Sequence, residues 1–388
     1  MLLDDRLSKE LEKLKRENLY RARTVRQGKQ GALIRIGECE YLNFSSNDYL
    51  GLASHPLVIQ AFKAGLDTYG VGSGGSALIT GNTQIHQKLE EKLAERTKRS
   101  KVLLFNSGFT ANVGIIDALV GRGDHLLLDR LSHASLIDGA RLAGAKLLRY
   151  RHVDMDHLDQ LTEKKQAKTW VVTESLFSMD GDQAPLQQIA DLCDRRSAHC
   201  YVDDAHGFGV YGENGAGCVN AAGLSQQEVP VLIATFGKAV GVGGAFVAGS
   251  EVLVETLIQK ARTSIYTTAM PPAQAAAILQ SLELIEKEAW RREKLFERIA
   301  QFRKGACDRQ IPLADNAHGP IQPIILKDSE KVMNVSNALL NKGIKVSAIR
   351  PPTVPRGTAR LRITITAAHK KEHVDKLLSA LSDILNHV

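Results

Sequence analysis

The chain has 388 residues, of which 44% are hydrophobic and 24% are charged, and its formal net charge is +7. This length accommodates one large domain and a smaller one, and the composition is typical of a globular protein. No apolar run approaches the roughly 18 residues of a membrane span, which argues against a membrane protein. The first residues are charged and helical in pattern, unlike a signal peptide.

The five cysteines are scattered along the chain, without the C-x-x-C spacing of a zinc site. We therefore expect a reducing cytoplasm, no disulfide framework and no metal. The positive net charge favours acidic ligands, namely phosphates, carboxylates or an acidic carrier. Nucleic acid is the other option. Against it, aromatic residues make up only 5% of the chain and are not interleaved with the basic residues.

In chain order, residues 2–20 have the leucine spacing of an amphipathic helix, and a short hairpin follows at 32–44. From residue 101 onward, short apolar runs alternate with helical segments. Strands are expected at 102–105, 125–129, 146–150, 170–173, 200–202, 231–234 and 244–248. This alternation predicts an α/β fold with a mostly parallel sheet covered by helices on both faces. Ligands of such sheets bind beyond the carboxyl ends of the strands.

After about residue 265 the pattern changes to that of a small α+β domain. Residues 273–305 form one long helical stretch in the pattern, and strands and helices then alternate to the end of the chain. We predict three parts: an N-terminal segment that packs with the small domain, 1–54; a large domain, 55–268; and the small domain, 269–388.

Two G-x-G-x-x-G matches, at residues 70–75 and 207–212, raise the alternative of a dinucleotide-binding fold. The first follows a helix and not a strand. The second follows a strand but opens into a turn, where no helix begins. Both matches therefore fail the structural context that the dinucleotide fingerprint requires, which argues against a nicotinamide cofactor.

Lys238 stands just after the apolar run 231–234, among glycines and alanines. The nearest carboxylates in the sequence, Glu228 and Glu251, are too far along the chain to be local partners. Burial lowers the pKa of a lysine, and a neutral amine is a nucleophile. Lys238 is therefore a candidate Schiff-base lysine, and a surface lysine at a strand-to-loop corner is the alternative.

Other expected strands also end in polar side chains. After strand 102–105, Ser107 begins a helix whose first amides can bind a phosphate, and N-capping by Ser107 is compatible with that role. The remaining strand ends lead to His133, Ser178, Asp203 with Asp204 and His206, and Thr235. Pyridoxal phosphate needs such a set, namely a lysine for an imine, a carboxylate for the pyridine nitrogen and a helix start for the phosphate.

Asp203 and Asp204 are adjacent residues at the end of a strand, so their side chains point to opposite faces and only one can reach the cofactor. A metal site of these two carboxylates and His206 is the alternative on ligand type. No further protein ligand is evident in the sequence, which argues against it.

Several stretches together resemble the pyridoxal-phosphate α-oxoamine synthases, a branch of the aspartate-aminotransferase-like transferases of fold type I. The likeness runs nearly end to end. It is carried by YLNFSSNDYLGL (41–52), GSGGSALITG (72–81), SGFTAN (107–112), RLSHASLIDGA (130–140), SMDGD (178–182), VDDAHGFGV (202–210), TFGKAVGVGGAFV (235–247) and AIRPPTVPRGTARLRIT (348–364).

The resemblance implies a role for each matching residue. The catalytic residues would be the imine-forming Lys238, Asp203 at the pyridine nitrogen, His206 near the ring hydroxyl and His133 stacked on the ring. Further cofactor contacts would come from Gly108, Phe109, Ser178 and Thr235. Among the substrate contacts, Arg362 would clamp the amino-acid carboxylate, with further contacts from Asn47 and His133. Arg21 and Thr353 would contact the acyl substrate.

The implied reaction is a decarboxylative condensation of L-alanine with a pimeloyl thioester of coenzyme A or of an acyl carrier protein. The family also implies a cytoplasmic homodimer, because residues 70–81 and 266–268 resemble segments that reach a neighbouring subunit's site. Glycine C-acetyltransferase, 5-aminolevulinate synthase and serine palmitoyltransferase share this chemistry and stay open as alternatives. A catalytically silent partner subunit is an alternative of another class, against which the retained catalytic residues argue.

Overall fold

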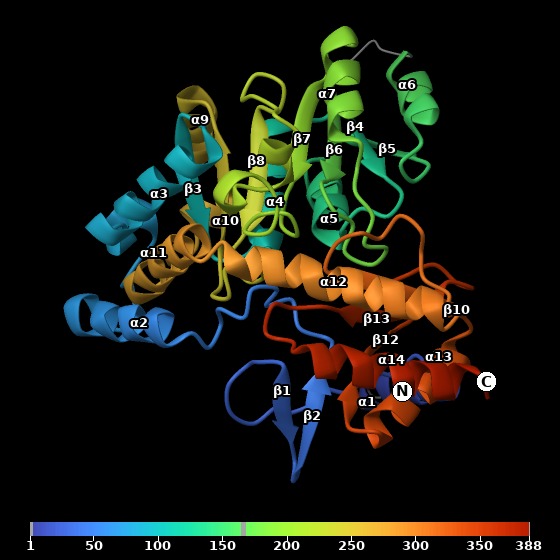
Figure 1. Ribbon diagram of the computed structural model, residues 1–388. Coiled ribbons are helices and arrows are strands. Elements are labelled where there is room, and N and C mark those ends of the chain that lie inside the picture. Colours follow the sequence, from blue (N-terminus) through green and yellow to red (C-terminus); the bar gives the residue numbers. More distant parts are fainter. Residues whose placement is uncertain (1–2, 164–167, 388) are drawn as a thin grey trace. The chain divides into compact units, whose positions relative to one another are not determined.

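The computed structural model describes residues 3–163 and 168–387, and these form two compact units (Figure 1). The large unit comprises Leu52–Ser178 and Gln183–Arg291. The small unit comprises Met1–Gly51, Met179–Asp182 and Arg292–Val388. Residues 269–291 therefore lie with the large unit, whereas we had predicted a boundary after residue 268.

The large unit is built on a seven-stranded sheet with the strand order β3-β9-β8-β7-β6-β4-β5. Only β9 runs antiparallel to its neighbours, which confirms the predicted mostly parallel sheet. The sequences of these strands are nearly continuous apolar runs because the sheet is buried on both faces. The strands are β3 (Lys101–Phe105), β4 (His125–Asp129), β5 (Lys146–Tyr150), β6 (Thr169–Glu174), β7 (His199–Asp203), β8 (Val231–Thr235) and β9 (Ala245–Gly249).

Helices connect the strands of this sheet, and one face of it carries the core formed with α4, α5 and α9. The helices are α2 (Pro56–Tyr69), α3 (Gln84–Thr97), α4 (Gly108–Leu119), α5 (Ala134–Leu142), α6 (Met155–Glu163), α7 (Leu186–Arg195), α8 (Cys218–Ala221), α9 (Glu251–Lys260), α10 (Arg262–Ile265) and α11 (Pro272–Lys287), with the short helical turns η1 (Ala77–Gly81) and η2 (Glu213–Gly215).

The small unit contains two three-stranded sheets, with the orders β1-β2-β11 and β10-β13-β12. Every pair of strands is antiparallel except β2 with β11. Its elements are α1 (Leu3–Arg16), β1 (Leu33–Ile36), β2 (Cys39–Asn43), α12 (Trp290–Asp308, which begins two residues before the unit), β10 (Ile321–Lys327), α13 (Ser329–Asn341), β11 (Ile344–Lys345), β12 (Ser347–Ile349), β13 (Ala359–Thr364) and α14 (Lys371–Leu385).

The helical stretch expected at 273–305 is in fact two helices, α11 and α12, which are separated at Glu288. The α11 helix packs closely on α2 in the large unit. A Cβ atom at Gly65 of α2 would lie only 2.7 Å from the Cα of Ala273, so this close approach requires glycine. This contact between the helices explains why α11 belongs with the large unit.

Candidate active site

The first turn of α4 lies at the carboxyl end of β3 and exposes backbone amides. The Ser107 hydroxyl accepts a hydrogen bond from the Thr110 amide at 3.2 Å, which caps the helix and leaves the amides of Gly108 and Phe109 for a ligand. A Cβ atom at Gly108 would lie 2.5 Å from the Cγ2 of Thr235, so only glycine lets this turn approach β8 so closely.

Asp203 ends β7 and is held by groups from two elements. Its Oδ2 accepts a hydrogen bond from Asn112 Nδ2 at 2.7 Å, and its Oδ1 accepts one from the amide of Ala205 at 3.0 Å. The side chain is only 6% exposed. The carboxylate therefore has a fixed position at the end of the sheet, as a permanent partner for a cationic ring nitrogen requires.

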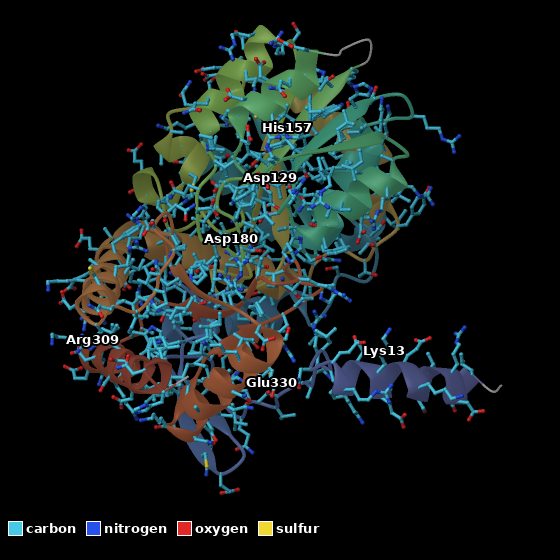
Figure 2. The ribbon with its side chains drawn as sticks, turned by 90° about the vertical axis from the view of Figure 1, so that its right-hand side faces the viewer. Lys13, Asp129, His157, Asp180, Arg309 and Glu330 are labelled. Carbon is cyan, nitrogen blue, oxygen red and sulfur yellow. The ribbon has the colours of Figure 1, made fainter. Side chains whose placement is uncertain are left out.

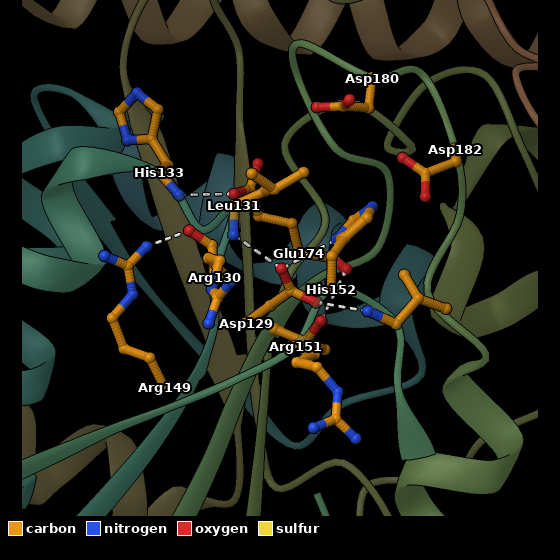
Figure 3. Close-up of polar contacts among 12 residues, drawn as sticks. Asp129, Arg130, Leu131, His133, Arg149, Arg151, His152, Glu174, Asp180 and Asp182 are labelled. Carbon is orange, nitrogen blue, oxygen red and sulfur yellow. Dashed lines mark hydrogen bonds and ion pairs between the residues drawn. The ribbon is translucent and has the colours of Figure 1, made fainter. Parts of the chain in front are cut away.

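His133 caps the start of α5, and its side chain is partly exposed. Its Nδ1 and the Ser135 hydroxyl lie 2.8 Å apart, and its backbone amide donates to Glu174 Oε1 at 2.6 Å (Figure 3). The ring of Phe109 lies edge-on to it, with 6.4 Å between the ring centroids. The hydrogen bond to Glu174 thus holds the backbone of His133, and its partly exposed imidazole can stack on a ligand.

Two carboxyl groups, Glu174 and Asp129, lie beneath His133. Glu174 ends β6 and pairs in register with Asp203 of the neighbouring strand. Burial, with the nearby Asp203, raises the pKa of Glu174 to about 8. Asp129 accepts from the amide of Leu131 and contacts His152 Nδ1 at 2.9 Å (Figure 3). The floor of the site is therefore polar and rigid.

Asp204, the neighbour of Asp203, points into a different environment. It is fully buried, its Oδ1 accepts from the Ser175 hydroxyl, and its Oδ2 accepts from the amide of Cys218 at 2.8 Å. Burial raises the pKa of Asp204 to about 7. Its two oxygens thus bind the protein itself. His206 is buried in the turn that follows, with 4% of its surface exposed.

Lys238 lies half-buried in the turn after β8. Its charge acts on two residues at the neighbouring strand ends, because it lowers the pKa values of His133 and Glu174. Burial is the main cause of the low pKa of His133, and Asp203 opposes it. Ser178 is half-buried in the turn that follows β6. The predicted cofactor residues of the large unit thus all end or follow strands of one sheet.

Apart from His133, the predicted substrate residues lie in the small unit, where Arg362 and Asn47 are in contact. Arg362 Nη1 donates to Asn47 Oδ1 and to the hydroxyl of Thr364, both at 3.1 Å. Burial raises the pKa of the adjacent Tyr49 to about 12, so its phenol is neutral. These two hydrogen bonds hold the Arg362 guanidinium against the neutral oxygens of Asn47 and Thr364, in a fixed orientation that suits a planar fork for a carboxylate.

Arg360, two residues before Arg362 on β13, has a different partner. Its guanidinium is 3% exposed and forms an ion pair at 2.5 Å with Asp180, whose side chain is 22% exposed, and it also donates to the carbonyl of Met179. This pair fixes the segment Met179–Asp182 within the small unit. Arg360 is therefore bound to a carboxylate of the protein itself, whereas Arg362 donates to the oxygens of Asn47 and Thr364.

Arg21 and Thr353, the two residues that we predicted at the acyl position, are also in contact. Arg21 Nη2 donates to the Thr353 hydroxyl at 2.9 Å, although 332 residues separate them in the sequence. Both side chains are exposed. A long-range contact thus brings the N-terminal segment to the loop before β13.

The residues of the large unit fit pyridoxal phosphate. Thr235 Oγ1 is buried and, within the described part of the chain, has no hydrogen-bond partner. The Thr235 side chain packs against Gly108 at the start of α4, so a phosphate bound at this helix start would supply the missing acceptor. Asp203 supplies the carboxylate and Lys238 the amine that this cofactor needs.

The other ligand types find less support. Among residues 3–163 and 168–387, no group of three His, Cys, Asp or Glu side chains is placed to hold a metal ion. In the same ranges no helix is long and apolar enough to cross a membrane. The glycine-rich residues 70–75 lie in a loop before η1, and residues 207–212 lie in turns, so neither has the strand-to-helix context of a dinucleotide site.

Together, the sheet topology and the residues at its strand ends define a pyridoxal-phosphate-dependent transferase of fold type I. Residues 40–381 match the family "Aminotransferase class I and II", and the chain belongs to this family. It is therefore a pyridoxal-phosphate-dependent enzyme.

The relatives narrow the class further. The chain is 50% identical over 391 aligned positions to the 8-amino-7-oxononanoate synthase of Saccharophagus degradans, which covers 100% of this chain and 98% of that one. It is 52% identical to the 8-amino-7-oxononanoate synthase of Nitrosococcus oceani, over 97% and 100% of the two chains.

Solved structures agree with this family. Serine palmitoyltransferase from S. paucimobilis with bound pyridoxal phosphate and myriocin has a TM-score of 0.93 at 29% identity, over 99% of this chain and 97% of that one. The 8-amino-7-oxononanoate synthase of Francisella tularensis has a TM-score of 0.79 at 32% identity, over 89% and 98%.

Asn112 is a site residue that the sequence reasoning missed. Its Nδ2 donates to Asp203 and to the Ser135 hydroxyl at 2.9 Å, and its Oδ1 accepts from Tyr201 at 2.7 Å. It thereby links the carboxylate to the residue that contacts His133. Asn112 lies within the motif SGFTAN, and the signal available in the sequence was an amide side chain about one turn into the helix expected after Ser107.

We expect Asn112→Ala to weaken cofactor binding and to lower the free energy of unfolding by about 1–3 kcal/mol, because buried partners lose their hydrogen bonds. Titration of the cofactor-free protein with pyridoxal phosphate, and chemical denaturation, measure the two effects. Ser135→Ala is the matched variant, since it leaves the bond between Asn112 and Asp203 intact. Equal cofactor affinities for the two variants would contradict a role of Asn112 in positioning Asp203.

Proposed function

We propose that the chain is an 8-amino-7-oxononanoate synthase, which condenses L-alanine with a pimeloyl thioester and releases carbon dioxide in biotin biosynthesis. The observation that carries this proposal is the identity of about half of all positions with proteins of that name over nearly the full chain. The serine palmitoyltransferase structures, at 29% identity, are similar in fold but more distant in sequence.

On the cofactor side, the amides of Gly108 and Phe109 and the hydroxyl of Thr235 would hold the phosphate. Asp203 would keep the pyridine nitrogen protonated, and His133 would stack on the ring. Ser178 and His206 would add contacts from the turns after β6 and β7. When bound, pyridoxal phosphate supplies an aldehyde that takes up amino groups and a cationic ring that accepts the electron pair left on Cα.

Lys238 would handle the proton of the amino acid. Its Nζ would take the proton from Cα of alanine and later return one to the product carbon. A base works best when its pKa lies near the operating pH. Glu174, largely protonated at neutral pH, adds little negative charge that would hold the amine protonated.

Arg362 and Asn47 would bind the carboxylate of alanine, and Arg21 and Thr353 would contact the acyl substrate. The polar contacts between Arg362 and its neutral neighbours orient the guanidinium before substrate arrives. Such a fixed fork matches the two oxygens of a carboxylate.

Arg362→Lys is expected to lower kcat/KM for alanine roughly 30- to 150-fold, or about 2–3 kcal/mol, because lysine keeps the charge and loses the planar fork. The kinetics of thioester use should change much less. Arg360→Lys, which alters the residue paired with Asp180, is the matched control and should affect alanine use less. If thioester binding collapses while alanine binding survives, Arg362 belongs to the acyl site.

The function is tested by steady-state assays of the purified protein with alanine, glycine and serine, each combined with pimeloyl, acetyl, succinyl and palmitoyl thioesters. We expect alanine with the pimeloyl thioester to have the highest kcat/KM, with one carbon dioxide and one thiol released per product. A preference for glycine with the acetyl or succinyl thioester would identify glycine C-acetyltransferase or 5-aminolevulinate synthase in its place.

The proposal includes a homodimer. Residues 70–81 and 262–270 of the large unit lie side by side, since Ala269 N donates to Gly75 O and the Ser73 hydroxyl donates to Met270 O. Their apolar side chains are strongly exposed, with Val71 at 84% and Ile79 at 78%. Asn106, next to the α4 start, donates to Thr268 O, so this patch adjoins the phosphate position.

Light scattering is expected to give about twice the 42.4 kDa mass of one chain. Ile79→Glu should shift the protein towards monomer and lower activity, because it places a charge in the proposed interface. Val252→Glu, at a 76%-exposed position on α9, is the control and should leave the mass unchanged. A fully active monomer would refute the dimer.

A further inference from the structure

The positive charge of the chain is concentrated in one short segment of the small unit. Residues 13–29, the basic segment, carry seven lysines and arginines and a single acidic residue, Glu17. Since the net charge of all 388 residues is +7, nearly the whole excess of positive charge lies in this segment.

These charges are exposed and little used inside the protein. Every Lys and Arg of the basic segment is exposed. Within the described residues, the ion pair of the segment is Lys13 with Glu17, at 3.9 Å and with side chains 68% and 42% exposed. Figure 2 labels Lys13 on α1, a helix with no buried residue. A long, exposed ion pair of this kind contributes little to the stability of the fold.

The basic segment is attached to the small unit where the acyl substrate is expected. Arg350 donates to the carbonyls of Asn18 and Tyr20, and Arg21 donates to Thr353. Arg21 and Arg350 are close enough that Arg21, after burial, lowers the pKa of Arg350. Two like charges held together repel each other until an anion binds them.

We propose that the basic segment is the docking surface for an acidic protein that carries the acyl thioester on a phosphorylated arm. This rests on the proposed function and names the source of its acyl group. The arm's phosphate would lie near Arg21 and Arg350, and the acidic face of the carrier would contact the flanking cations. The apolar side chain of Val25, 77% exposed within the segment, adds a hydrophobic contact.

The spread of the charges favours a protein over coenzyme A. The cations extend from the last turn of α1 through a dozen residues without helix or strand, apart from an isolated bridge at Gln27. A single nucleotide can contact only a few of them, whereas an acidic protein surface can contact many. A membrane surface fits less well, because α1 itself carries Asp4, Asp5, Glu10 and Glu12 among its basic residues.

The test compares pimeloyl thioesters of an acyl carrier protein and of coenzyme A as substrates with alanine. The double variant R23E/K29E changes two residues of the docking surface, neither of which is among the residues proposed to bind the cofactor, alanine or the acyl arm. We expect KM for the carrier thioester to rise about tenfold and its salt dependence to weaken, because attraction becomes repulsion. The kcat value and KM for the coenzyme A thioester should stay within about twofold. The control R195E/K376E, with the same charge change at exposed positions elsewhere, should change neither substrate's KM.

Other outcomes would overturn the proposal. If KM rises equally for both thioesters in R23E/K29E, the segment serves the shared arm or the fold. If KM rises for neither thioester, docking on this segment is excluded. Binding to vesicles with 30% phosphatidylglycerol that the double variant loses, with an unchanged KM for the carrier, would assign the segment to a membrane surface. If wild type turns over neither thioester, the proposed function fails. In that case the binding of a labelled carrier protein, measured by fluorescence anisotropy, still tests docking. Docking predicts weaker binding by R23E/K29E than by wild type.

Discussion

Replacing Lys238 with alanine is expected to lower kcat by roughly 10²–10⁴-fold, the range that a positioned proton-transfer group contributes. In the proposed mechanism, Lys238 Nζ both binds the cofactor and moves the proton at Cα of alanine. The positive charge of Lys238 lowers the pKa values of His133 and Glu174, which lie at or after the ends of neighbouring strands. Alanine at this turn leaves the phosphate and ring contacts in place, so the variant should still bind pyridoxal phosphate.

Borohydride reduction followed by peptide mass spectrometry provides the measurement that is independent of activity. Wild type should carry the cofactor mass on the peptide that contains Lys238, and the alanine variant should carry none. Lys260→Ala, at an exposed lysine that ends α9, is the control and should keep both activity and label. A label on another lysine, or turnover within tenfold of wild type in the Lys238 variant, would remove Lys238 from this role.

The large-unit sheet could be predicted because its strands are buried on both faces. Apolar runs such as 125–129 and 231–234 then stand out against polar turns, and the structure has strands at β4 and β8. The break between α11 and α12 could not be predicted, because the apolar period continues across it. Which unit a helix joins depends on contacts such as Gly65 with Ala273, more than 200 residues apart in sequence.

Some residues of the candidate site could likewise be predicted from the sequence, whereas others could not. Residues at strand ends, such as His133 and Asp203, are found from local pattern because parallel strands bring their carboxyl ends to one edge. The bonds of Asn112 to Ser135 and Asp203 span 23 and 91 residues, and no local period reports them. The high pKa of Glu174 has the same origin, because it depends on burial and on a carboxylate from the next strand.

The adjacent residues Asp203 and Asp204 show what the alternation of side chains along a strand can and cannot predict. Alternation predicts that the two carboxylates face apart. In the structure Asp204 binds Ser175 and the amide of Cys218, whereas Asp203 binds Asn112 of α4. The pattern alone could not say which of them is enclosed by the protein. The role of Asp203 at the cofactor stays a prediction that mutation can test.

Asp203→Asn is expected to lower kcat by roughly 10²–10³-fold, because removing one partner of a buried charge pair costs about 3–5 kcal/mol and some of that loss falls on cofactor binding. The amide has nearly the shape of the carboxylate and can still accept from Ala205 N, but it carries no charge to hold a proton on the pyridine nitrogen. Cofactor affinity, measured by titration of the cofactor-free variant, should fall as well, which a purely structural effect elsewhere would not explain.

Asp204→Asn is the matched control, one residue along the same strand end. Burial raises the pKa of Asp204 from 3.8 to about 7, so the wild-type carboxyl favours folding most below pH 4 and loses that contribution as the pH rises through about 7. Asparagine does not titrate, so this variant should lose less stability than wild type between pH 4 and pH 7 and should keep kcat within a few-fold. Equal losses of kcat in the two variants would show that the cofactor-facing carboxylate was assigned to the wrong side of the strand.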